Sequence, residues 1–122
     1  MRTAAQAWVA VLLPALGLLC GCHSSHIDAT VENRTGAAIE QLEVDYPSAS
    51  FGADNLATGV DYHYRVHVRL SGPVKVQYTE GASHQVRQMT GPNLSEGQEG
   101  RLEIVLLPDG KAEFHPDLSS QR

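Results

Sequence analysis

The stretch that decides the fold is DYHYRVHVRLSGPVKVQYTE, residues 61–80. Apolar and polar side chains alternate through residues 62–70 and again through residues 74–78. Alternation with a period of two is typical of a strand that buries one face and exposes the other to water. The Ser-Gly-Pro triplet at residues 71–73 is a turn signal. We therefore expect two consecutive strands, the first of them spanning residues 62–70.

The same pattern extends in both directions along the chain, punctuated by Gly, Pro, Asn and Asp. Further alternating runs lie at residues 27–32, 39–46, 84–89, 102–106 and 112–114. The apolar phase shifts between Ile39 and Leu42, which predicts a bulge near Glu40. We expect residues 52–59 and 91–100 to be loops, because they are rich in glycine and polar residues.

Many short alternating segments predict an all-β domain. We expect a single antiparallel β-sandwich (immunoglobulin-like or fibronectin-like) of about seven or eight short strands, with a small β-barrel as the alternative. A local resemblance supports the sandwich. Residues 56–66, LATGVDYHYRV, look like the Leu-x-x-Gly-x-x-Tyr passage of fibronectin type III domains. That resemblance implies a tyrosine corner at Tyr62, although too few residues precede it for that family's topology.

Length and charge narrow the possible functions. The chain has 122 residues, with 9 Lys and Arg against 14 Asp and Glu, for a net charge of −5. This length is enough for one domain. The acidic balance argues against a nucleic-acid partner, because such proteins need a basic surface to neutralise phosphates.

The N-terminus has the pattern of a signal peptide. Arg2 is followed by an apolar run at residues 7–19, too short to span a bilayer. The run ends in Leu19-Cys20-Gly21-Cys22, which resembles the lipobox of bacterial lipoproteins. The resemblance implies lipidation of Cys22 and cleavage just before it. Cys22 is preferred over Cys20 because the small Gly21 precedes it. An ordinary secretory signal and a retained membrane anchor are the alternatives.

These features predict four parts of the chain and a location. Residues 1–21 are the signal peptide, 22–26 a lipidated tether, 27–115 the β-sandwich and 116–122 a disordered tail. The protein is expected in the cell envelope, attached to the membrane through Cys22 on the periplasmic side. His23 after the lipidated cysteine favours the outer membrane over the inner.

The most unusual local feature is the polar face of the alternating run at residues 62–70, which we call the central run. It places four basic or titratable side chains in one line, namely His63, Arg65, His67 and Arg69. One interpretation is an interaction face for an anion or for an acidic segment of a protein partner. The other is ordinary cross-strand pairing with acidic neighbours such as Glu40, Glu43 or Glu103.

The sequence nominates no catalytic residues and no cofactor, because it lacks the common nucleophile, zinc and phosphate-loop motifs. His63 and His67 would be about 13 Å apart along a strand, too far to share a metal ion. His23 and His26 in the tether could form a loose Cu(II) or Zn(II) site. We therefore expect an accessory subunit that binds another envelope protein. A small anion- or metal-binding lipoprotein is the alternative, and an enzyme is third.

Overall fold

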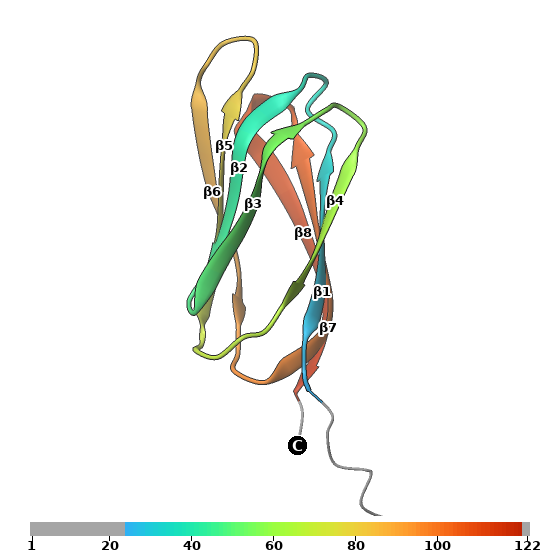
Figure 1. Ribbon diagram of the computed structural model, residues 1–122, viewed down its shortest axis with the longest axis vertical. Helices are drawn as coiled ribbons and strands as arrows, with labels where there is room; N and C mark the ends of the chain where they lie inside the picture. The colour runs from blue at the N-terminus through green and yellow to red at the C-terminus, as the bar shows by residue number, and fades with distance from the viewer. Residues whose placement is uncertain (1–23, 121–122) are drawn as a thin grey trace, which may run out of the picture.

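The computed structural model describes residues 24–120. They form eight strands and one short 3-10 turn (Figure 1). The strands are β1 (Ile27–Asn33), β2 (Ile39–Tyr46), β3 (Ala49–Leu56), β4 (Asp61–Val66), β5 (Gly72–Glu80), β6 (Val86–Leu94), β7 (Gln98–Leu107) and β8 (Lys111–Ser120), and the turn η2 (Pro108–Gly110) joins the last two. Residues 24–120 contain no helix that could span a bilayer.

The strands form two four-stranded sheets that pack face to face (Figure 1). The first sheet has the order β4-β1-β7-β8, and the second has the order β3-β2-β5-β6. The prediction of an all-β sandwich is therefore confirmed. Five of the six strand pairings are antiparallel, whereas β1 and β7 pair in parallel. An immunoglobulin constant-type domain instead divides its strands into sheets of four and three.

The core lies between the sheets and contains the apolar phase of the alternating runs. Val66 on β4 is 2% exposed, and Ile104 on β7 is fully buried. Core side chains come from both sheets, among them Ile27, Val31, Val44, Val76, Tyr78 and Leu102. Burial of one face of each sheet explains why the period-two pattern predicted the fold class so well.

The sequence predicted a single strand through the central run, residues 62–70, but the observed strand is shorter. β4 ends at Val66, where its pairing with Ile27 of β1 also ends. Residues 67–71 then cross from the first sheet to the second, where β5 begins. The alternation continues through this crossing segment because Val68 is buried, at 6% exposure, between two exposed neighbours.

Three segments expected to be irregular are in fact strands. β3 covers residues 49–56 by pairing with β2, and β6 extends to Leu94 by pairing with β5. The predicted disordered tail is also wrong for residues 116–120, since β8 pairs with β7 as far as Ser120. Strand partners supplied by the fold override the weak local preference of these glycine- and proline-containing stretches.

Local backbone features accommodate the irregular sequence. The predicted bulge in β2 is confirmed by a register shift between Glu40 and Glu43 and by a positive φ of 52° at Gln41. Gly52 faces this strand, and a Cβ at its position would collide with the Leu42 carbonyl oxygen. Glycine is therefore required in β3 because the two backbones approach closely.

The expected signal peptide, the lipidation at Cys22 and His23 lie outside the described residues. The described chain begins and ends at the same end of the sandwich (Figure 1). We call the end that contains both termini of the described chain the proximal end. It comprises residues 24–26, 47–48, 67–71, 95–97 and 120. The distal end comprises the loops at residues 34–38, 57–60, 81–85 and 108–110.

Candidate interaction face

The four predicted side chains divide between two parts of the molecule. His63 and Arg65 lie on the outer surface of β4, whereas His67 and Arg69 lie in the crossing segment at the proximal end. All four are exposed. The straight strip expected from the alternation is therefore shortened to two residues on the sheet, because β4 ends at Val66.

Strand register places these two residues in rows that cross the first sheet. The row through Arg65 continues with Asp28 on β1, Arg101 on β7 and Asp117 on β8. Its charges alternate in sign. Arg65 Nε lies 3.8 Å from Asp28 Oδ1, and Arg101 Nη2 lies 3.7 Å from Asp117 Oδ2. Such exposed pairs contribute only about 0–1 kcal/mol, so they leave the side chains available to other partners.

The next row contains His63, Thr30, Glu103 and His115. His63 Nδ1 lies 3.0 Å from Thr30 Oγ1. A shallow depression of about 350 Å³ joins the two rows and is lined by Asp28, Thr30, Arg101, Leu102, Glu103, His115 and Asp117. We call these two rows, eight residues in all, the outer charged face.

Glu103 of this face forms a pair of carboxyl groups with Glu32. Glu32 is only 6% exposed, and its Oε1 lies 2.6 Å from Arg34 Nη2. A hydrogen bond with Glu103 holds the pKa of Glu32 below its ordinary value, while burial acts in the opposite direction. The same hydrogen bond and the negative charge of Glu32 raise the pKa of Glu103. Glu103 therefore holds its proton more readily than an isolated glutamate does, whereas Glu32 gives up its proton more readily.

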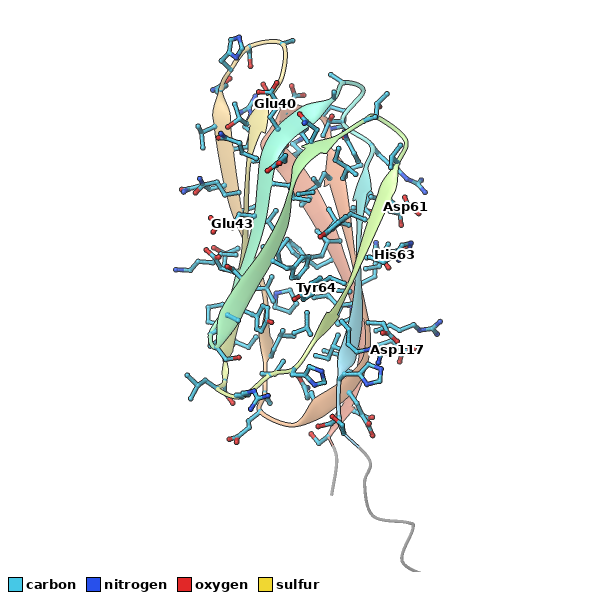
Figure 2. All side chains as sticks on the ribbon, in the orientation of Figure 1. Glu40, Glu43, Asp61, His63, Tyr64 and Asp117 are labelled. Atoms are coloured by element: carbon cyan, nitrogen blue, oxygen red, sulfur yellow. The ribbon has the colours of Figure 1, made fainter. Side chains whose placement is uncertain are left out.

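The acidic partners suggested by the sequence are mostly not the ones that the fold supplies. Glu40 and Glu43 lie on β2 of the second sheet, on the opposite side of the molecule from His63 (Figure 2). Glu103 is on the same sheet but in the His63 row, and Arg65 pairs with Asp28 instead. The exposed phase of the first strand already contained Asp28, but only the β1–β4 register brings it beside Arg65.

The sequence did not predict a cluster of aromatic side chains between the two sheets. Three tyrosines surround Phe51 where the edge strands β3 and β4 face each other, and Figure 2 shows Tyr64 in this gap. The Tyr64 ring stacks on Phe51 at 4.7 Å and is 43% exposed. Tyr62 stacks on Phe51 at 6.2 Å, and no hydrogen bond of its hydroxyl is found within residues 24–120. The fibronectin-like tyrosine corner is therefore absent from the described structure.

The histidines among residues 24–120 do not all gather at one point of the domain. Among residues 24–120, no group of three or more His, Cys, Asp or Glu side chains has a metal-binding arrangement. His84 lies in a distal loop and His115 lies on β8.

Comparisons of the chain with protein-family models, with curated proteins and with solved structures gave no match.

Proposed function

We propose that this protein is a lipid-anchored protein of the bacterial cell envelope that binds another envelope protein through its outer charged face. The observation that supports the proposed lipid anchor is the Leu19-Cys20-Gly21-Cys22 sequence at the end of an apolar run. Strand β1 begins at Ile27, so only a few residues separate Cys22 from the folded domain. A tether this short keeps the proximal end close to the lipid surface.

The outer charged face supports binding to a protein rather than to one small anion. Its charges alternate in sign along a row that crosses all four strands of the sheet. Neighbouring strands are about 4.8 Å apart, so the row spans roughly 14 Å. Only a partner surface with complementary alternating charges can satisfy the whole row, and such complementarity favours specificity. With Cys22 anchored and the proximal end at the lipid, this face lies on the side of the domain and does not face the membrane.

Labelling with a fatty acid tests the anchor. The wild type and Cys20→Ser should incorporate the label, because Gly21 precedes the modified cysteine in both. Cys22→Ser should remain unlabelled and keep its signal peptide. Normal labelling of Cys22→Ser would contradict the proposed anchor.

Cross-linking in intact cells tests the binding face. The wild type and Lys75→Ser, which removes a cation from the second sheet, should capture the same partner. The double variant Arg65→Ser, Arg101→Ser should lose that partner while keeping its melting temperature, because both ion pairs are exposed. Capture by the wild type should also weaken as salt rises. Undiminished capture by the folded double variant would exclude this face.

A further inference from the structure

Two histidines that are distant in sequence lie side by side at the proximal end. His26 directly precedes β1 and His67 directly follows β4. The antiparallel register pairs Ile27 with Val66, and the next residue beyond the end of each strand is a histidine. Their ring centroids are 6.2 Å apart, with the planes inclined at 62°. Neither sequence spacing nor strand alternation could have indicated this pair.

Backbone carbonyls orient both imidazoles in the same manner. His67 Nδ1 lies 3.0 Å from the Ser25 carbonyl oxygen, and His26 Nδ1 lies 3.4 Å from the Ser24 carbonyl oxygen. A carbonyl oxygen only accepts hydrogen bonds, so these contacts favour the neutral tautomer with its proton on Nδ1. The Nε2 lone pair is then free. A histidine that binds a metal ion through one ring nitrogen usually donates the N–H of the other to a carbonyl or carboxylate oxygen in this way.

The surroundings of the pair favour a cation. Asp28 Oδ1 lies 3.6 Å from His26 Nε2 and supplies a negative charge beside that nitrogen. The His26 side chain is 29% exposed and His67 is exposed, so an ion can reach them from solution. The opposing charge is Arg65, whose Nε lies 3.8 Å from the same Asp28 Oδ1.

We infer that His26 and His67 bind one divalent transition-metal ion through their Nε2 atoms. Water completes the coordination, and Asp28 supplies the nearby negative charge. Ligand bonds of about 2.0–2.1 Å place both ligating nitrogens within about 4 Å of each other, so the two solvent-accessible imidazoles turn their Nε2 atoms toward one another on binding. Two imidazoles suit Cu(II), Ni(II) and Zn(II), and the general affinity order places Cu(II) first. The inference is independent of the proposed protein partner and of lipidation.

Titration of the full chain with Cu(II), in detergent and without a polyhistidine tag, tests the site. Loss of a group that only hydrogen-bonds a metal ligand already costs about 10–100-fold in affinity. Loss of a ligand in His26→Ala or His67→Ala should therefore weaken the tightest site at least about tenfold. The matched controls His63→Ala and His115→Ala should bind as the wild type does. Arg65→Ser should tighten binding and Asp28→Asn should weaken it, because of the charge changes beside the ion.

Nuclear magnetic resonance of 15N-histidine in the wild type gives a second measurement that does not depend on the folding of a variant. Substoichiometric Cu(II) should broaden the Nε2 signals of His26 and His67 before those of His63 and His115. Equal broadening of all four would overturn the inference. So would unchanged affinity in His67→Ala together with lost binding in His23→Ala, since the ion would then be held by the tether alone.

Discussion

At the scale of single residues, Asn33 is the polar group on which the distal end depends. It is fully buried at the end of β1. Its Nδ2 donates to the carbonyl oxygens of Ala37 and Leu56, at 2.8 and 2.9 Å. Its Oδ1 accepts hydrogen bonds from the backbone N–H and the hydroxyl of Thr35. The side chain thus connects the loop after β1 to the end of β3 and has its hydrogen-bonding capacity satisfied.

Substitution Asn33→Ala should lower the free energy of unfolding by about 2–3 kcal/mol, because the buried Leu56 carbonyl loses its side-chain donor. Urea denaturation measures this loss. Asn55→Ala, at an exposed position on β3, is the matched control and should change stability by less than about 0.5 kcal/mol. Similar losses in the two variants would contradict the role assigned to Asn33.

Tyr78 is the opposite case, a buried polar group that the fold leaves unsatisfied. Its side chain is fully buried on β5, and its hydroxyl has no hydrogen-bond partner among the described residues. Burial raises the pKa of this hydroxyl, and the nearby charge of Glu80 adds to the effect. The ring contributes to the core, while the hydroxyl carries a desolvation cost.

Substitution Tyr78→Phe should therefore raise the free energy of unfolding, by about 1 kcal/mol, since an unpaired buried donor costs about 1–3 kcal/mol. Thermal melting provides the measurement. Tyr62→Phe removes the hydroxyl of a half-buried ring and should leave the melting temperature nearly unchanged. A destabilised Tyr78→Phe would mean that its hydroxyl has a partner.

At the scale of elements, the hairpin of β5 and β6 is closed by a carboxylate network. Glu80 accepts hydrogen bonds from the Ser83 hydroxyl at 2.6 Å and from Arg87 Nε at 2.9 Å. These two bonds hold the pKa of Glu80 below its ordinary value. Because the folded-state pKa is the lower one, ionised Glu80 stabilises the protein at neutral pH. That contribution disappears as the pH falls through the folded-state pKa.

The substitution Glu80→Gln should lower the melting temperature at pH 7, and the difference from the wild type should shrink in acid. Melting curves between pH 7 and pH 3 would reveal the convergence. Asp54→Asn removes one exposed negative charge from β3 and should follow the wild-type curve. A Glu80→Gln deficit that stays constant across this range would contradict the proposed linkage.

At the scale of the whole molecule, the two ends of the sandwich should meet different environments. β7 and β8 have ten residues each, so the ends are separated by roughly 30 Å. Leu70 is 58% exposed in the crossing segment of the proximal end, and Val60 is 45% exposed in a distal loop. Anchoring at Cys22 would hold Leu70 near the lipid headgroups and Val60 far from them.

Fluorophores on Leu70→Cys and Val60→Cys test this orientation in vesicles that contain a headgroup-linked quencher. The proposed processing leaves no other free thiol. Quenching should be strong at position 70 and weak at position 60. Equal quenching at both positions would exclude an upright domain with its proximal end at the membrane.

The sequence by itself determined the fold class and the buried phase of most strands. Alternation with a period of two follows directly from one face of each strand being buried, and the buried Val66 and Ile104 both lie on the apolar phase of their alternating runs. The bulge near Glu40 was also visible, because a phase shift in the apolar pattern is a local property of the chain.

Only the tertiary structure decided which strands are neighbours, and the candidate sites depend on that choice. The β1–β4 register brings Asp28 beside Arg65 and His26 beside His67, and the β7–β8 register extends the charged row to Asp117. The extent of β3, β6 and β8 was likewise set by their partners. Pairing between distant segments is a property of packing and backbone hydrogen bonding across the whole domain, which local alternation does not encode.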